Sequence, residues 1–131
     1  MFKKISLVLV ITLAMLTTSC EKKPTEMTFE SQVHDFGTIK QGDKVVHDFK
    51  FTNTGGSDLI ITDAKGSCGC TVPAYPKEPV KPGESGVIKV SFDSHGKSGE
   101  HSKSVTVFCN VEHGNKVLNI KANIEALLPT K

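Results

Sequence analysis

Two cysteines separated by one glycine are the residues of this sequence best suited to chemistry. They stand in the stretch Gly66-Ser67-Cys68-Gly69-Cys70-Thr71. In an oxidising compartment, neighbouring exposed thiols form disulfides. The glycine makes the small ring between Cys68 and Cys70 feasible, and a strained bridge is easier to reduce. Three interpretations of this disulfide or thiol pair therefore stay open: a structural link, a redox couple, and a pair of metal ligands.

Histidines elsewhere in the chain could complete a metal site. Two thiolates with one or two imidazoles suit copper(I) or zinc. If the strands follow immunoglobulin order, one pole of the fold gathers His47, Cys68, Cys70, His95 and His101. Against this, the spacing matches no known zinc finger, and such histidines are ordinarily solvated or structural. We expect no cofactor, with copper or zinc as the alternative.

No other set of catalytic residues stands out in the sequence. It contains no Gly-x-Ser-x-Gly elbow, no paired carboxylates on one element and no His-Glu-x-x-His motif. The triplet Asp35-Phe36-Gly37 occurs in protein kinases, but this chain is too short for two kinase lobes and lacks the glycine-rich loop. We therefore predict that the protein is not an enzyme, with no small-molecule substrate evident.

The first twenty residues have the pattern of a bacterial export signal. Two lysines precede an apolar run at residues 5–16, which is too short to span a bilayer, and small residues then lead to Cys20. The pattern resembles a lipoprotein signal, although Thr17 stands where leucine is usual. We expect residues 1–19 to be the signal peptide and Cys20 to be the lipidated amino terminus. The alternative is ordinary cleavage that leaves Cys20 as a free thiol.

The expected location and partners follow from this signal and from the charge. A lipidated Cys20 would make the protein an exported, membrane-anchored lipoprotein that faces the periplasm or lies on the cell surface. Residues 20–26 read as a short tether. Sixteen lysines less the two in the signal leave fourteen, against fourteen carboxylates, and there is no arginine. Because arginine is the side chain best matched to phosphates and base edges, we expect no binding to nucleic acid.

Alternating side chains predict an all-β domain over residues 27–125, followed by a tail at 126–131. Runs with a period of two occupy residues 44–54, 88–92, 105–111 and 118–124, and residues 59–61 read as a short strand. Turn-forming residues separate these runs. About seven short strands at this spacing predict a single immunoglobulin-like β-sandwich.

The usual disulfide between the sheets of an immunoglobulin domain is not expected here. Cys109 lies at a core position, but the strand expected to face it, residues 44–54, carries phenylalanines and no cysteine. Free cysteines commonly act as small buried hydrophobes. We predict this role for Cys109.

An extended, proline-rich segment follows the cysteine pair. Residues 71–79 contain three prolines, and proline cannot donate to a sheet ladder, so the segment cannot pair as a central strand. Tyr75 is the one large aromatic residue of this segment. It is the best candidate for contact with a partner.

Several short motifs occur along the chain in an order that resembles a known family. They are Asp35-Phe36-Gly37-Thr38-Ile39, Phe49-Lys50-Phe51-Thr52-Asn53-Thr54-Gly55, Ser67-Cys68-Gly69-Cys70-Thr71, Pro82-Gly83-Glu84 and Val90-Ser91-Phe92-Asp93. They resemble a bacterial exported lipoprotein family of unknown function, domain of unknown function 1573, over about residues 29–124. The resemblance implies an immunoglobulin-like fold akin to major-sperm-protein and Hydin-type modules, and no established enzymatic activity.

Together these features predict a non-enzymatic, lipid-anchored cell-envelope protein that binds or scaffolds other envelope proteins. Addition of a partner strand to a sheet edge is the expected mode of binding. The alternative is a thiol-based protein that binds copper or zinc, or acts in redox chemistry, through Cys68 and Cys70.

Overall fold

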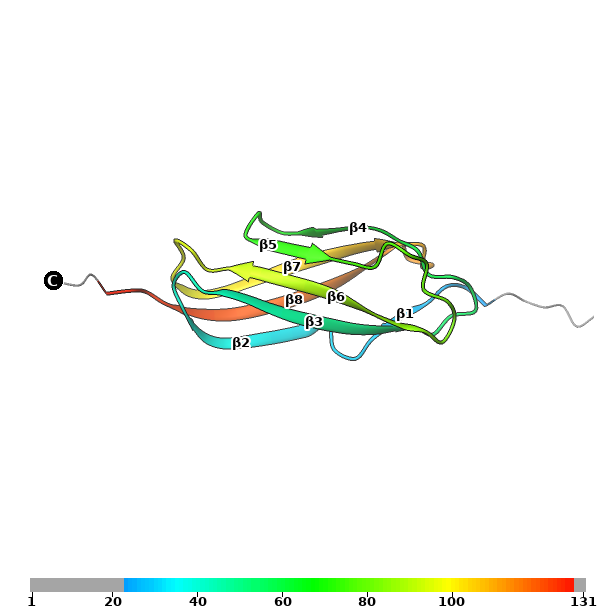
Figure 1. Ribbon diagram of the computed structural model, residues 1–131, viewed down its shortest axis with the longest axis horizontal. Coiled ribbons are helices and arrows are strands. Elements are labelled where there is room, and N and C mark those ends of the chain that lie inside the picture. Colours follow the sequence, from blue (N-terminus) through cyan, green and yellow to red (C-terminus); the bar gives the residue numbers. More distant parts are fainter. Residues whose placement is uncertain (1–22, 129–131) are drawn as a thin grey trace, which may run out of the picture.

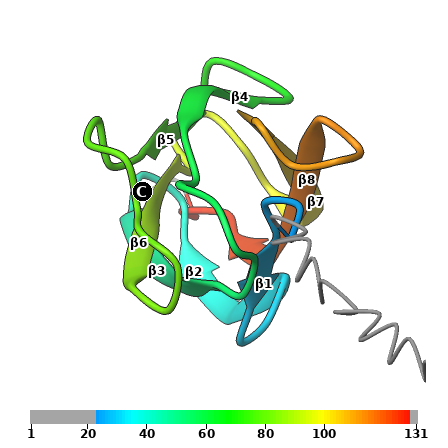
Figure 2. The ribbon, with the colours of Figure 1, turned by 90° about the vertical axis from the view of Figure 1, so that its right-hand side faces the viewer.

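The computed structural model describes residues 23–128, which form two four-stranded β-sheets packed face to face (Figures 1 and 2). The first sheet has the order β1 (Met27–Phe29), β3 (Lys44–Asn53), β6 (Ser85–Asp93) and β5 (Thr71–Ala74). The second has the order β2 (Val33–Lys40), β8 (Asn115–Glu125), β7 (Gly99–Cys109) and β4 (Ile61–Gly66). The predicted all-β sandwich is confirmed, with eight strands where about seven were expected. The predicted signal peptide and Cys20 lie outside the described residues.

The core between the sheets follows from the alternation of side chains along the strands. Pairing of β3 with β6 places Phe49 opposite Ile88, and both are buried. From the second sheet, Val107 and Leu118 are buried in the same cluster. Residues two apart along a strand lie on the same face, so each strand has one apolar and one polar face. The apolar faces of the two sheets meet in the core, and the polar faces lie outward.

Cys109 belongs to this core, as predicted. It is a free cysteine, 7% exposed, at the end of β7. Burial raises the pKa of the Cys109 thiol, so the sulfur stays protonated near neutral pH and is a poor nucleophile.

The strand predicted at residues 59–61 is displaced. Leu59 forms an isolated bridge with Val80, and the strand proper, β4, begins at Ile61. Most of β4 is polar, and its pairing with β7 is irregular between Ile61 and Asp63, so alternation was too weak to reveal it. The next strand, β5, pairs only with β6, at the edge of the first sheet. Its edge position agrees with the predicted exclusion of residues 71–79 from a central strand.

The last residues of the predicted tether lie against the domain. Thr25 is buried, and the Thr54 N–H donates to the Glu26 carbonyl oxygen at 3.1 Å. The Lys116 ammonium donates to Glu26 Oε1 at 2.8 Å, and this hydrogen bond holds the pKa of the Glu26 carboxyl below its usual value. Lys23–Glu26 therefore form the first part of the folded domain.

The sandwich has two distinct ends. The proximal end, where the described chain begins, contains the end of β3 and the docked residues 23–26 (right in Figure 1). The distal end contains the start of β3 and the end of β6, where Lys44 pairs with Asp93. The ten residues of β3 separate these ends by about 30 Å. Within residues 23–128 no helix is long and apolar enough to cross a membrane.

Candidate functional site

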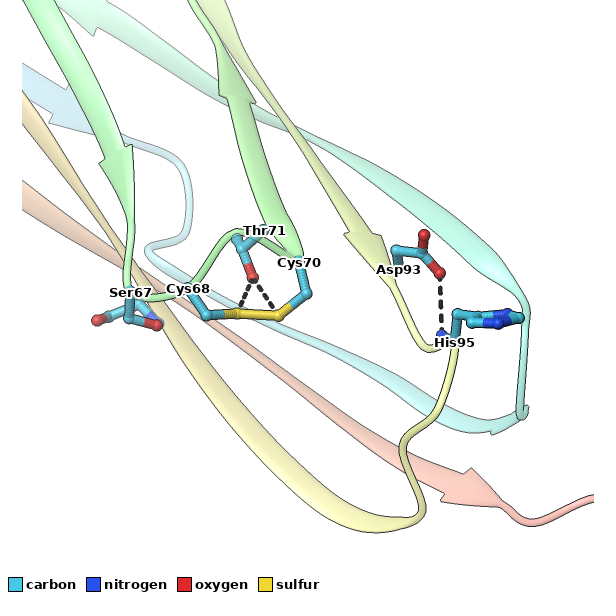
Figure 3. The surroundings of a disulfide bond; sticks show 7 residues. Ser67, Cys68, Cys70, Thr71, Asp93 and His95 are labelled. Carbon is cyan, nitrogen blue, oxygen red and sulfur yellow. Dashed lines mark hydrogen bonds between the residues drawn. A yellow bond between two sulfur atoms is a disulfide. The ribbon is translucent and has the colours of Figure 1, made fainter.

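The Cys68–Cys70 disulfide lies where the chain crosses from one sheet to the other, at the distal end (Figure 3). β4 ends at Gly66 on the edge of the second sheet, and β5 starts at Thr71 on the edge of the first. The Ser67 N–H donates to the Ser104 carbonyl oxygen on β7 at 2.8 Å, and the Asp93 N–H on β6 donates to the Cys70 carbonyl oxygen at 2.9 Å. The four-residue crossing is thus fixed to both sheets.

Thr71 places a hydroxyl group beside both sulfur atoms. Its Oγ1 lies 3.8 Å from Cys68 Sγ and 3.9 Å from Cys70 Sγ (Figure 3). A disulfide sulfur has no proton, so the hydroxyl is the donor in these contacts. Thr71 is 3% exposed, and its N–H donates to the Cys68 carbonyl oxygen at 3.1 Å. Sequence reasoning included Thr71 in the cysteine motif but gave it no role, because the sequence does not reveal where a hydroxyl points.

The histidines of the predicted metal site do not gather around the cysteines. His95 follows β6, close along the chain to Asp93, but its ring is exposed and directed away from the disulfide in Figure 3. His101 Nε2 is hydrogen-bonded to the Ser98 carbonyl oxygen at 3.0 Å. Over residues 23–128, no group of three His, Cys, Asp or Glu residues could hold a metal ion. The strand ends that carry these residues do lie at the distal end, as topology predicted, but their side chains do not converge, because topology does not give the direction of each side chain.

His47 instead pairs with a histidine of the other sheet. Its ring stacks on His34 of β2 with centroids 3.6 Å apart and planes inclined by 7°. Phe36 meets the edge of His34 at 4.6 Å, and Phe49 meets His47 at 4.7 Å. Burial, together with the charge of a protonated His34, holds the pKa of His47 below its usual value, whereas Asp48 acts in the opposite direction. This pair closes the side of the sandwich between β2 and β3, which is a structural role.

Tyr75 also has contacts within the protein. Its hydroxyl donates to the Thr62 carbonyl oxygen at the start of β4, at 3.1 Å. The ring packs against the core, and Lys77 Nζ lies 3.6 Å from the ring centroid. These contacts hold the proline-rich segment against β4. Contact between Tyr75 and a partner stays a prediction.

Two outward-facing valines form a row on the outer face of the first sheet. Val46 of β3 and Val72 of β5 both pair with Ser91 of β6, so the three residues lie side by side on one face. Val46 is 53% exposed and Val72 is 58% exposed. We call these three residues the valine row. Val46 departs from the polar pattern of the outward positions Asp48, Lys50 and Thr52 on the same strand, and this departure is the sequence signal for the surface.

A shallow hollow connects the valine row to the disulfide. It has a volume of about 260 Å³ and is lined by Lys44, Gly69, Cys70, Val72, Ser91, Phe92 and Asp93. Lys44 Nζ lies 3.9 Å from Asp93 Oδ2 at its rim. A larger hollow of about 610 Å³, on the second sheet, is lined mainly by polar residues, including His101. The first hollow is therefore the one that adjoins both an apolar surface and a reactive group.

The strand β2 has a protected edge. Side-chain oxygens cap three of its backbone N–H groups: Ser31 Oγ accepts from Val33 at 3.3 Å, Asp35 Oδ1 from Gly37 at 2.8 Å, and Asp43 Oδ2 from Lys40 at 3.0 Å. Edge strands with occupied N–H groups are poor templates for an added strand.

The edges of β4 and β5 are protected as well. On β4, Asp63 Oδ1 accepts the Ala64 N–H at 2.8 Å. On β5, the Cys70 carbonyl oxygen accepts a hydrogen bond from β6. The backbone N–H and C=O positions of the alternate residues Thr71 and Pro73 therefore point away from β6, toward the open edge. Proline has no N–H, and the N–H of Thr71 is already bonded to Cys68. These features disfavour addition of a partner strand at β2, β4 and β5, three of the four sheet edges, the fourth being β1.

The chain belongs to the family described as "Protein of unknown function (DUF1573)", which matches residues 27–124. The cysteine motif and nearly all of the sandwich described above lie within this match. No curated protein matches the sequence significantly.

Several solved structures share the fold at low sequence identity. A protein of unknown function from Porphyromonas gingivalis W83 is 17% identical, with a TM-score of 0.68 over 78% of this chain and 48% of that chain. This chain thus spans about half the length of that protein. The ASH/PapD-like domain 7 of human CEP192 is 9% identical, with a TM-score of 0.62 over 80% of this chain and 89% of that chain.

An enzyme also contains a domain of this fold. The secreted serine protease VesC from Vibrio cholerae is 14% identical, with a TM-score of 0.61 over 79% of this chain and 24% of that chain. At these identities the likeness concerns the fold alone, and one fold hosts many functions.

Proposed function

We propose that this protein is a non-enzymatic, lipid-anchored module of the bacterial cell envelope that binds other envelope proteins through the valine row. The observation that carries this proposal is the pair of half-exposed valines, Val46 of β3 and Val72 of β5, which flank Ser91 of the intervening strand β6 on one face. Apolar side chains at the centre of a polar rim supply most of the free energy of protein association. Lys44 and Lys89 provide such a rim.

The protected strand edges favour binding through a sheet face over binding by strand addition. The capped N–H groups of β2, β4 and β5 leave little for a partner strand to pair with. The outer face of the first sheet, in contrast, presents side chains that a partner can cover without displacing any backbone hydrogen bond.

The proposed anchor at Cys20 would orient this surface. Since Lys23–Glu26 are docked on the domain, only two residues separate Cys20 from the folded part, a reach of about 10 Å. The proximal end would then lie close to the membrane. The distal end, with the disulfide and the adjoining hollow, would point about 30 Å away from it.

The second candidate function is thiol redox chemistry at Cys68 and Cys70. A specific observation favours it: the two sulfurs are bonded to each other in a half-buried position at the distal end. The copper or zinc alternative has less support. A disulfide offers no thiolate to a metal, and residues 23–128 hold no set of three ligands.

Photo-crosslinking in the producing bacterium tests the binding surface. With a benzophenone side chain at position 72, we expect one discrete adduct, and with the same group at exposed Val117 on the second sheet we expect none. Adding Val46→Lys to the first variant should lower the adduct yield about tenfold, because a charge would replace an apolar contact. Equal yields at positions 72 and 117, or a yield insensitive to Val46→Lys, would rule out the valine row.

A further inference from the structure

The disulfide is accessible at the surface of the distal end. Cys68 and Cys70 are both half-buried, and Gly69 between them is exposed. An added methyl group on Gly69 would meet no atom within 4 Å. The bridge therefore lies beside open space, unlike a structural disulfide enclosed in a core.

We infer that Cys68–Cys70 is a thiol–disulfide exchange site for a dithiol oxidoreductase, and that the Thr71 hydroxyl stabilises the thiolate released in the exchange. A thiolate of the oxidoreductase attacks one sulfur of the bridge, the Cys68–Cys70 bond breaks, and a mixed disulfide forms. The second thiol of the oxidoreductase then attacks the mixed disulfide. Two electrons and two protons pass to the protein, which gains two thiols, and the oxidoreductase gains a disulfide.

The geometry distinguishes the two sulfurs. Cys70 packs against the core and lines the hollow, and its carbonyl oxygen is bonded to Asp93. Cys68 does not belong to the residues packed on the core. Attack is therefore directed to Cys68, and Cys70 leaves as the thiolate.

Two groups near Cys70 stabilise that thiolate. Thr71 Oγ1 lies 3.9 Å from Cys70 Sγ, and Thr71 is nearly inaccessible to water. Because water does not compete for the hydroxyl proton, this group can donate a hydrogen bond to the sulfur when the sulfur becomes a thiolate. Lys44 lines the same hollow and adds positive charge, which its ion pair with Asp93 partly offsets. A hydrogen bond and a nearby cation both lower the pKa of a thiol.

The test is the rate at which dithiothreitol reduces the bridge in the folded, purified protein, followed by alkylation and mass analysis. Thr71→Val removes the hydroxyl and keeps the shape of the side chain, so reduction should slow about tenfold. Thr71→Ser keeps the hydroxyl and should react within about twofold of the unchanged protein. Thr38→Val, on the exposed part of β2, is the matched control and should not alter the rate.

A pH profile separates this role of Thr71 from a structural one. In the reduced protein, iodoacetamide should label Cys70 at lower pH than Cys68. Thr71→Val should move the Cys70 profile to higher pH by about one pH unit. Two results would overturn the inference: reduction only at the rate of global unfolding, or rates and pH profiles identical in Thr71→Val and the unchanged protein.

Discussion

Gly66→Ala is expected to lower the free energy of unfolding by about 3 kcal/mol or more. A methyl group on Gly66 would overlap the carbonyl oxygen of Thr71, which belongs to the backbone of β5. That backbone cannot move away easily, because the adjoining Cys70 carbonyl oxygen is bonded to β6. Urea denaturation followed by far-ultraviolet circular dichroism measures the loss.

Gly69→Ala is the matched control, at the glycine three residues after Gly66. The site has open space around it, and its φ is not positive. Its free energy of unfolding should change by no more than about 0.5 kcal/mol, and the disulfide should still form. Equal denaturation midpoints in the two variants would mean that the two sheets are not held together at the crossing as described.

Asn53→Ala is expected to cost about 3 to 5 kcal/mol of unfolding free energy. Asn53 is 0% exposed, at the end of β3. Its Nδ2 donates to the carbonyl oxygens of Ser57 and Val80 at 2.7 and 2.8 Å, and its Oδ1 accepts from the Gly55 N–H at 3.0 Å. Alanine would remove the side-chain partner of the Ser57 carbonyl oxygen and of the Gly55 N–H, and would leave the Val80 carbonyl oxygen with the Leu59 N–H alone, at a position that is fully buried in the protein.

The loop held by Asn53 also supports the docked residues 23–26, since the Gly56 N–H donates to the Pro24 carbonyl oxygen. Thermal and urea denaturation should therefore show a less stable protein with a looser proximal end. Asn123→Ala, at an exposed position of β8, is the control and should fall within about 0.5 kcal/mol of the unchanged protein. A loss below 1 kcal/mol in Asn53→Ala would show that the loop does not depend on this side chain.

The strands with a buried apolar face could be predicted from the sequence. The alternation in β3, β6, β7 and β8 is strong because each of these strands has one face in the core. The burial of Cys109 followed from the same pattern. β4 was misplaced because it is an irregular edge strand with a polar sequence, and neither face produces a clear period.

The candidate site could be predicted only in part. The spacing of Cys68 and Cys70 pointed to the reactive pair, since one intervening glycine keeps two sulfurs close in any fold. The sequence could not show that the histidines lie apart from the cysteines, because alternation assigns a residue to one face of a strand but does not reveal which side chain of another strand it contacts. His47 faces inward as expected, yet it meets His34 of the opposite sheet.

The measurement that tests the account most directly is palmitate incorporation into the full-length protein and its Cys20→Ala variant, with separation of membrane and soluble fractions. The proposed orientation, with the disulfide and the valine row directed away from the membrane, depends on lipidation of this one residue. We expect label and membrane association in the unchanged protein, and loss of both in Cys20→Ala. Label that persists in Cys20→Ala, or an unchanged protein without label, would contradict the account.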